Sequence, residues 1–368
     1  MSINKFGMKV ILILIALTIL AGCKPSADKS NDYNWALLPF IKADDVNPVL
    51  LPDTNSTFLC PIRNTIVQWE EKDVFNPAAV VRNDTVFLLF RAEDSIGKFA
   101  GTSRIGIAWS TDGLHFRKHP VPVLYPDNDA EKIYEWEGGC EDPRIVEDEN
   151  GTYYMTYTAY DGDKARLLVA SSKDLYHWTK YGPVFKNDTT EVNKWSKSGS
   201  IVCKYENGKA IAVKIGGKYC MYWGDTDIFM AVSDDLINWI QVIVAADGNK
   251  TVFGPRRKKF DSDLVEPGPP AMLTEKGIVL IYNSRNVPSK GDTSLVEGTY
   301  SASQILFDKN NPTKVIDRMD TYFMKPDKPY EITGQVNHVC FVEGLVHYKG
   351  KWFLYYGTAD SKIAVAVK

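Results

Sequence analysis

Two adjacent carboxylates, Glu141 and Asp142, follow a pair of glycines and precede a proline within residues 136–145. An alternating run that is typical of a strand begins directly after this proline. Such a position holds a carboxylate at the end of a strand on stiff backbone, which suits proton transfer. A turn that carries two solvated acids would have the same local sequence, so the rest of the chain must separate the two interpretations.

The elements that must position these carboxylates repeat along the chain from Val74 onward. Three similar segments of seven residues each follow a short apolar run and end on Phe or Trp. Their central aspartates, Asp112, Asp174 and Asp235, are 62 and 61 residues apart. We interpret each segment as a polar turn of the scaffold that joins two strands, although two of them also contain a histidine.

An aromatic-rich strand pattern occurs five times in the same part of the chain. Its equivalent residues are Phe90, Tyr157, Trp223, Tyr282 and Tyr356, at spacings of 67, 66, 59 and 74 residues. Five units of about four short strands, with Gly, Asn and Asp turns and no convincing helix, predict an all-β fold, a five-bladed β-propeller. A pair of β-sandwiches is the alternative, but it explains the single regular period less well.

In a propeller the innermost strand of each blade lines the central axis, so the residues that open these strands should gather at one end of the channel. One strand before each aromatic landmark, the sequence has Asn76-Pro77, Glu141-Asp142-Pro143, Lys197-Ser198-Gly199, Glu266-Pro267-Gly268-Pro269-Pro270 and Glu343-Gly344. Three of the five segments contain acids. We therefore expect carboxylates that are distant in sequence to converge on one pocket, as a glycosidase requires.

A second layer of polar residues follows the aromatic strands, where each blade returns across the same face. The candidates there are Arg91, Tyr160, Asp161, Asp225, Asp227, Asn283 and Asp360, and Arg104 and Lys214 are added from neighbouring strands. Their equivalent positions in different blades favour a binding surface, although any one of them has the residue type of an ordinary turn.

The N-terminus predicts export. Lys5 and Lys9 precede an apolar run that is too short to span a bilayer, and the run ends in Leu-Ala-Gly-Cys. This ending predicts a lipoprotein signal peptide over residues 1–22 and lipidation of Cys23. Residues 23–34 are then a polar tether, and residues 35–368 form the catalytic propeller. The expected location is the bacterial cell envelope, with a lipid anchor as the only membrane contact.

The composition excludes other classes of function. The formal net charge is −3, which argues against a nucleic-acid partner, and aromatic residues reach 12%, which suits strands and sugar-stacking surfaces. Five cysteines besides Cys23 show no CxxC or Cys/His cluster, and the five histidines show no HExxH pattern. We expect no metal and no cofactor, and buried free thiols rather than a disulfide between Cys203 and Cys220.

Five motifs in order along residues 70–368 resemble those of glycoside hydrolase family 130. They are Glu141-Asp142-Pro143-Arg144, Tyr157-Thr158-Ala159-Tyr160-Asp161-Gly162, Lys197-Ser198-Gly199, Gly268-Pro269-Pro270 and Tyr356-Gly357-Thr358-Ala359-Asp360. The resemblance implies a five-bladed propeller that cleaves β-mannosides with inversion, in most members with phosphate as nucleophile and in a smaller group with water. It also implies that Asp142 is the general acid, acting through a mannose hydroxyl, and that Asp360 holds the sugar, with help from Arg91 and Arg104.

The chain departs from the phosphorylase pattern of this family, which implies a histidine after the aromatic strand of the fourth blade. Here the sequence is Tyr282-Asn283-Ser284, and Asp161 stands where a phosphate site would favour cations. We therefore predict an inverting exo-acting β-1,2-mannosidase that uses water. Glu266 is the first candidate for the base, followed by Asp225 or Asp227, and an inverting pair should lie about 6.5–9.5 Å apart. Arg144 could lower the pKa of Asp142 by pairing with it.

Three other functions remain open at this level. The first is phosphorolysis, with a substitute phosphate pocket built from the run Arg256-Arg257-Lys258-Lys259 together with Lys214 and Arg285. The second is a lipoprotein that captures glycans without cleaving them. The third is a related five-bladed arabinosidase or xylosidase, because those folds also place three carboxylates on the axis.

Overall fold

The computed structural model describes residues 33–244, 248 and 250–368, and one compact unit spans Trp35–Lys368. The predicted signal peptide, Cys23 and all but the last two residues of the predicted tether lie outside the described residues. Within the part of the chain that is described, no helix is long and apolar enough to cross a membrane.

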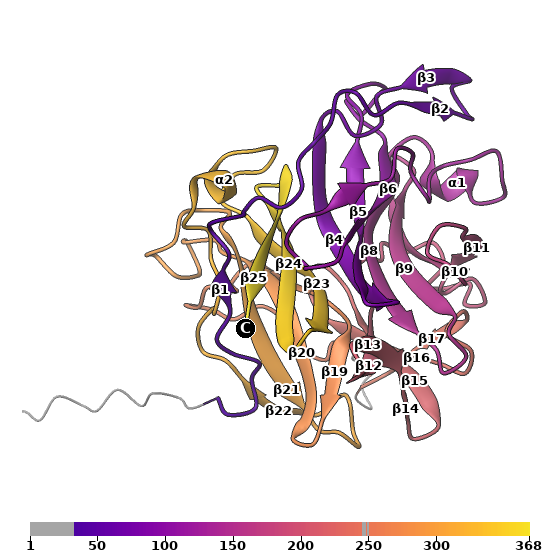
Figure 1. The fold of residues 1–368 in the computed structure, drawn as a ribbon. Coiled ribbons are helices and arrows are strands. Elements are labelled where there is room, and N and C mark those ends of the chain that lie inside the picture. Colours follow the sequence, from indigo (N-terminus) through magenta and orange to yellow (C-terminus); the bar gives the residue numbers. More distant parts are fainter. Residues whose placement is uncertain (1–32, 245–247, 249) are drawn as a thin grey trace, which may run out of the picture. The chain divides into compact units, whose positions relative to one another are not determined.

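The compact unit is a five-bladed β-propeller, as the repeats predict, and the alternative of two β-sandwiches is wrong. Antiparallel strands that follow one another in sequence build each blade (Figure 1). The first blade contains β4 (Asp73–Arg82), β5 (Thr85–Glu93), β6 (Ser103–Ser110) and β7 (Arg117–Lys118). The second contains β8 (Gly139–Glu147), β9 (Tyr153–Tyr160), β10 (Ala165–Ser172) and β11 (Thr179–Pro183).

The third and fourth blades depart from the simple four-strand pattern. The third contains β12 (Ser200–Glu206), β15 (Lys218–Trp223), β16 (Phe229–Ser233) and β17 (Trp239–Gln241), with β13 (Lys209–Ala212) and β14 (Lys214–Ile215) inserted after β12. In the fourth blade the innermost strand is broken into β18 (Leu264–Pro267) and β19 (Ala271–Thr274), followed by β20 (Gly277–Arg285), β21 (Tyr300–Phe307) and β22 (Val315–Arg318). The break falls at Gly268-Pro269-Pro270, because proline cannot donate to the ladder.

The fifth blade closes the ring with strands from both ends of the described unit. It contains β23 (Cys340–Tyr348), β24 (Lys351–Thr358) and β25 (Lys362–Val367), and β1 (Ile41–Lys42) pairs with β25 as the outermost strand. Outside the blades lie a hairpin of β2 (Phe58–Cys60) and β3 (Thr65–Val67) and two four-residue helices, α1 (Lys132–Glu135) and α2 (Pro329–Ile332). Pairing between the two ends removes a free sheet edge from the last blade.

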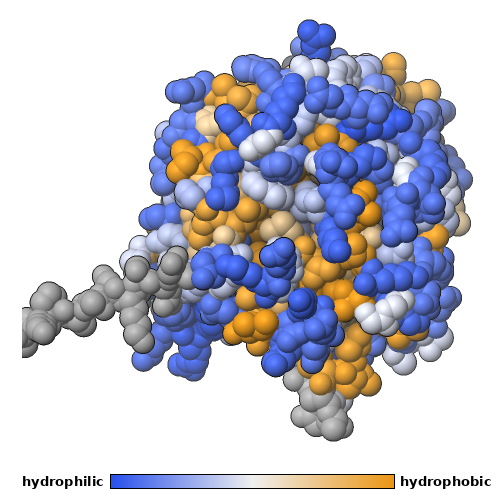
Figure 2. All heavy atoms as spheres, turned by 60° about the horizontal axis from the view of Figure 1, so that its bottom comes forward, coloured by the Kyte–Doolittle hydropathy of each residue, from blue (hydrophilic) through white to orange (hydrophobic). Residues whose placement is uncertain are grey.

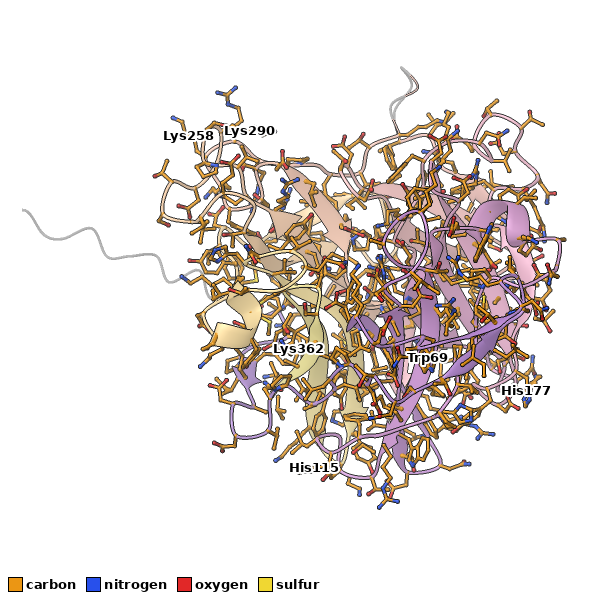
Figure 3. The ribbon with its side chains drawn as sticks, turned by 90° about the horizontal axis from the view of Figure 1, so that it is seen from above. Trp69, His115, His177, Lys258, Lys290 and Lys362 are labelled. Atoms are coloured by element: carbon orange, nitrogen blue, oxygen red, sulfur yellow. The ribbon has the colours of Figure 1, made fainter. Side chains whose placement is uncertain are left out.

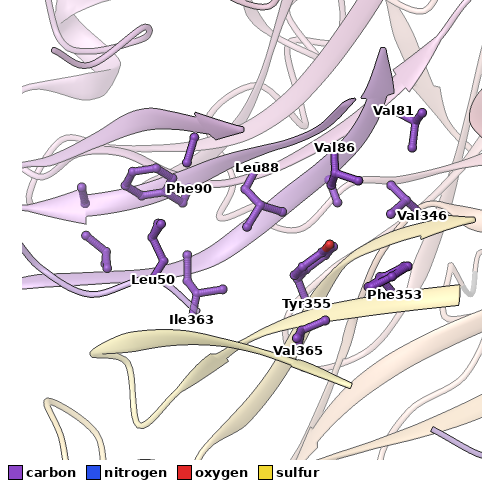
Figure 4. Packing of buried hydrophobic residues seen from close by; sticks show 14 of the residues in the cluster. Leu50, Val81, Val86, Leu88, Phe90, Val346, Phe353, Tyr355, Ile363 and Val365 are labelled. Atoms are coloured by element: carbon purple, nitrogen blue, oxygen red, sulfur yellow. The ribbon is translucent and has the colours of Figure 1, made fainter. Parts of the chain in front are cut away.

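Apolar side chains pack between neighbouring blades rather than along the axis. Figure 4 shows one such cluster, in which Val86, Leu88 and Phe90 of the first blade face Tyr355 and Val365 of the fifth. All five aromatic landmarks lie on the second strand of a blade and are buried. The face seen in Figure 2 is mostly hydrophilic, with hydrophobic side chains visible between the polar ones. The packed core therefore holds the blades together and leaves the axis to polar residues.

The repeated polar segments are turns, as the sequence predicts. Asp112 accepts bonds from the backbone N–H groups of Leu114 and His115, and Asp174 makes the equivalent contacts in the second blade. His115 and His177 each contact only their own turn aspartate among the side-chain bonds described, and both lie at the outer edge of the molecule (Figure 3). The five cysteines of the described region are free and buried, which confirms the expectation of free thiols.

Candidate active site

The innermost strands aim side chains at the axis through unusual backbone. Asn76, Asp142 and Ser198 open the innermost strands of the first three blades, and all three have positive φ, at 46°, 48° and 57°. In β4 and β8 the strand pairing shifts register at this point, which marks a bulge. Left-handed backbone is uncommon for residues other than glycine and concentrates at functional sites, where bulges turn a side chain toward a pocket.

A cavity of about 130 Å³ lies where these strands open. Its lining residues come from several blades and are Asn76, Arg91, Asp142, Lys197, Glu266, Tyr300, Val336, Val339, Phe341 and Asp360. Two larger grooves, of about 750 and 720 Å³, lie elsewhere and contain none of these residues. The small cavity is the candidate active site, because its lining brings three carboxylates and two cations from different blades together where the innermost strands open.

The Asp142 carboxylate, which lines the cavity, faces three donors. Asn76 Nδ2 donates to Asp142 Oδ1 at 3.0 Å, Arg91 Nη1 lies 3.5 Å from the same oxygen, and Lys197 Nζ lies 3.6 Å from Oδ2. Burial raises the pKa of Asp142, but the charges of Arg91 and Lys197 outweigh it and bring the pKa to about 2. The cations that lower the pKa are therefore chiefly Arg91 and Lys197, with Arg144 a smaller contributor.

Glu266 and Asp360 have the opposite electrostatic character. Burial raises the pKa of Glu266 to about 7, although Lys197 opposes the shift and the Ser198 hydroxyl donates to its Oε1. Burial also raises the pKa of Asp360 to about 7, against the charge of Arg91. The cavity thus combines one strongly ionised carboxylate with two that titrate near neutrality, a separation that is typical of acid–base pairs.

The raised pKa of Asp360 predicts a measurable effect on stability. The carboxyl has a pKa of about 7 in the folded protein and 3.8 as its ordinary value, so the folded state binds more protons between these values and stability falls as pH rises through this window. Asp360→Asn cannot ionise, so at pH 8 it should be more stable than the wild type by about 2–4 kcal/mol. Thermal and urea unfolding at pH 8 and pH 4 test this, and the difference should shrink at pH 4. Equal stability at pH 8 would contradict the raised pKa.

Arg144 lies below the cavity and joins the blades that carry Asp142 and Glu266. Its Nε donates to Gly268 O at 2.8 Å and its Nη2 to Pro267 O at 2.7 Å, while Nη1 donates to Asp142 O at 3.3 Å. Nη1 also lies 3.6 Å from Glu343 Oε1. Both side chains are buried, and burial raises the pKa of Glu343 well above its usual value despite the nearby Arg144. Arg144 therefore holds backbone on both sides of the axis rather than pairing with the Asp142 carboxylate.

Five of the residues that the sequence singles out line the cavity, namely Asn76, Arg91, Asp142, Glu266 and Asp360, and a sixth, Ser198, donates to the lining residue Glu266. Five other lining residues were not among the predicted site residues, and they are Lys197, Tyr300, Val336, Val339 and Phe341. Lys197 stands next to Ser198 at a strand opening, so its position in the repeat was a usable signal. Tyr300 and Val339 come together through a strand bridge, and nothing local in the sequence indicates this contact.

The structure places other predicted binding residues in contacts that serve the fold. Arg104 is buried and pairs with Asp94 at 2.8 Å. Asn283 bonds both backbone groups of Val342, so it fastens the fourth blade to the fifth. These two residues lie outside the set that lines the cavity.

Tyr160, Asp161 and Lys214 also lie outside the cavity lining. The Tyr160 ring contacts Phe99, and Asp161 pairs with Arg166 at 2.6 Å and accepts backbone N–H bonds in its own turn. Lys214 Nζ lies over the Tyr219 ring and lines one of the two larger grooves.

The basic run considered for phosphate is engaged elsewhere. Arg256 pairs with Asp261 at 2.8 Å and Lys259 with Asp320 at 3.1 Å. Arg285 lies 3.4 Å from Asp263, and Lys258 lies at the periphery of the molecule (Figure 3). None of these cations belongs to the described residues that line the cavity, and Arg285 is the strand partner of the lining residue Tyr300.

Comparison with known proteins gives consistent similarities. The model of a family described as β-1,4-mannooligosaccharide phosphorylase matches residues 54–368. A curated 1,2-β-oligomannan phosphorylase of Thermoanaerobacter sp. strain X514 is 30% identical over 87% of this chain and 94% of its own length. Among solved structures, a glycosyl hydrolase from Bacteroides ovatus is 47% identical, with a TM-score of 0.88 over 91% of this chain and 94% of that chain.

Another solved structure comes from work on glycoside hydrolases, within a family of mannoside phosphorylases, that target β-1,2-mannosidic linkages in Candida mannan. It is 46% identical, with a TM-score of 0.88 over 91% of this chain and 94% of that chain.

Proposed function

We propose that this chain, which belongs to glycoside hydrolase family 130 and is an enzyme that acts on β-mannosides, uses water to release mannose from β-1,2-linked mannosides. The charge balance of the cavity carries the proposal. Three carboxyl side chains line it against two cations, Arg91 and Lys197, and both cations already face carboxylates. Because Arg91 and Lys197 are already paired with carboxylates, neither is free to hold a phosphate dianion, whereas a neutral water molecule needs no cation.

The similarities point in two directions, and identity favours hydrolysis. The relative that is 46% identical is described with hydrolases of β-1,2-mannosidic linkages, whereas the phosphorylase of Thermoanaerobacter is 30% identical. Cavity size supports removal of single terminal residues. A volume of about 130 Å³ is well below the ~300 Å³ of the smallest typical drug-sized pockets, so it suits one sugar ring.

In the proposed mechanism, Glu266 takes a proton from the attacking water and Asp142 supplies a proton to the leaving oxygen through a sugar hydroxyl. A pKa near 7 suits Glu266 to the role of base at neutral pH. Asp142 is ionised in the free enzyme, because Arg91 and Lys197 stabilise its charge, so it must take up a proton from solvent as the substrate binds before it can act as the donor. Its contact with Arg91 is long, at 3.5 Å, so a hydroxyl that inserts between them weakens the pairing and raises the pKa of Asp142 toward that of a donor.

Product analysis tests the choice of nucleophile. The wild type should convert β-1,2-mannobiose to mannose at the same rate with and without phosphate, and NMR of the first product should show the α-anomer, as inversion requires. Asp142→Asn is the inactive control. Mannose 1-phosphate as the main product would overturn the proposal in favour of phosphorolysis, and sugar binding without turnover would favour glycan capture alone.

We also propose that the enzyme is exported and lipid-anchored to the bacterial cell envelope through Cys23. The basic start, the short apolar run and the Leu-Ala-Gly-Cys ending support this location. Cys23→Ser should move the protein from the membrane fraction to the soluble fraction, and labelling with a fatty acid should be lost in parallel. A wild-type protein that is soluble and unlabelled would contradict the anchor.

A further inference from the structure

Trp195 is an exposed aromatic residue whose orientation is fixed. Its side chain is 49% exposed, which is high for tryptophan, yet its indole Nε1–H donates to Asp225 Oδ2 at 2.7 Å. The backbone on its C-terminal side is also held, because Ser196 N donates to Ala165 O at 3.1 Å. A single exposed apolar residue is ordinary, but one that a buried neighbour and a carboxylate hold in place is pre-organised for contact.

The pair of Trp195 and Asp225 lies beside the cavity. Trp195 is two residues before Lys197, which lines the cavity, and Gly224 N donates to Lys197 O at 2.9 Å. On the other side, Val265 N donates to Thr226 O at 3.1 Å, directly before Glu266. The loop that carries Asp225 is therefore bonded to the backbone next to both Lys197 and Glu266. The charge of Asp225 also contributes to raising the pKa of Glu266, which requires the two carboxyls to be close.

Sugar chemistry fits this pair. One face of a β-mannopyranose ring carries only axial C–H bonds, at C1, C3 and C5, and such a face packs on an aromatic ring. The hydroxyls at the ring edge need acceptors, and Asp225 Oδ1 can serve as one while Oδ2 holds the indole. Because the cavity itself suits one ring, a second sugar must lie outside it, along the rim.

We propose that Trp195 and Asp225 form a binding subsite for the sugar on the leaving-group side of the scissile bond. The proposal rests on the proposed β-mannoside cleavage, but it holds for attack by water or by phosphate alike. It also gives Asp225 a different role from the one considered for it on sequence grounds. Asp225 holds the indole and binds a hydroxyl, and it does not act as the base.

Substrates with different leaving groups distinguish a loss of leaving-group binding at this subsite from a loss of bond cleavage in the cavity. Trp195→Ala should lower kcat/KM for β-1,2-mannobiose and β-1,2-mannotriose by about 10- to 100-fold, mainly through KM. The same variant should change kcat/KM for methyl β-mannoside by less than about 3-fold, because a methyl group is too small to reach the indole. Ile240→Ala, which removes an exposed apolar side chain from the outer strand of the same blade, should change neither.

Substitutions of Asp225 distinguish the subsite from a base. Asp225→Ala should raise KM for the mannobiose, because the indole loses its acceptor, and Asp225→Asn should raise it less, because the amide oxygen still accepts the Nε1–H. Equal losses of Trp195→Ala on methyl β-mannoside and mannobiose would overturn the subsite. A kcat loss of 100-fold or more in Asp225→Asn on methyl β-mannoside would also overturn it and restore Asp225 as the base.

Binding measured without turnover keeps this test separate from the proposed function. Calorimetric titration of mannobiose into Asp142→Asn should give a Kd that rises about 10-fold or more when Trp195→Ala is added. An unchanged Kd would overturn the subsite. If the wild type cleaves no β-mannoside and the Kd still rises, the proposed cleavage fails while the sugar-binding site stands.

Discussion

Glu266→Gln should lower kcat for β-1,2-mannobiose by about 10²- to 10⁴-fold, the usual range for the loss of a general base. The substitution keeps the size of the side chain, and its amide oxygen can still accept the Ser198 hydroxyl. KM should change little, because the proposed role of Glu266 is to activate water and not to hold the sugar. Initial rates and the Kd for mannobiose measure the two effects separately.

The pH profile shows whether Glu266 acts as the base or as the proton donor. The base must be ionised, and Asp142 is protonated in the proposed enzyme–substrate complex, so kcat at saturating mannobiose should rise as pH increases through about 7, the pKa of Glu266. Asp360 titrates in the same range, and Asp360→Asn separates the two, because the rise should persist in this variant. A rate that falls through pH 7 would instead make Glu266 the proton donor and Asp142 the base.

A small anionic nucleophile gives a control that needs no general base. Azide should restore part of the rate of Glu266→Gln and yield α-mannosyl azide, whereas it should not restore Asp142→Asn on mannobiose, because that variant lacks the proton donor. Failure of azide to restore Glu266→Gln, with mannobiose still bound, would place the defect elsewhere in the cavity.

The sequence predicts the architecture well because the repeat in the sequence reflects a packing requirement that every blade shares. Each blade must bury an aromatic residue on its second strand, so Phe90, Tyr157 and Tyr356 recur at a spacing that counts the blades. The same repeat locates the strand openings, and Asp142 and Glu266 line one cavity as a result. Residues at equivalent blade positions can be placed together without any knowledge of their contacts.

The repeat does not predict which polar residue of the second layer faces the axis. Arg91 and Arg104 are both arginines near a strand end, yet Arg91 lines the cavity and Arg104 pairs with the buried Asp94. Partners of this kind are set by packing between blades, as with Asn283, which bonds the backbone of Val342. The sequence also does not predict the protonation state of Asp142, because its pKa depends on where Lys197 and Arg91 come to lie.

Arg144 shows the same limit for the region below the cavity. Its place in the motif after Asp142 suggests an ion pair with that carboxylate, but its guanidinium instead donates to the backbone of Pro267 and Gly268, across the axis. Pro267 and Gly268 are 123 and 124 positions away from Arg144 in the sequence. The loop that follows Glu266 thus depends on a side chain from the blade of Asp142.

Removal of this side chain should have a large effect on stability. Arg144→Met should lower the free energy of unfolding by about 3–5 kcal/mol, because it leaves buried carbonyl oxygens without donors. Arg144→Lys should recover only part of the loss, since a single ammonium group cannot span carbonyls on two blades. Urea unfolding measures the change, and kcat should fall together with stability because the backbone that carries both proposed catalytic groups loosens.

Glu343→Gln is the matched control, because it tests whether Arg144 acts through charge or through its backbone contacts. Burial raises the pKa of Glu343 well above its usual value, which favours the neutral carboxyl, so the amide is a close substitute. The variant should therefore change stability by less than about 1 kcal/mol. A loss as large as that of Arg144→Met would mean that Glu343 is ionised and that the 3.6 Å contact is a buried ion pair, in which case the axis is held by charge. A small loss of stability in Glu343→Gln would mean that Arg144 links the two blades through its hydrogen bonds to backbone carbonyls.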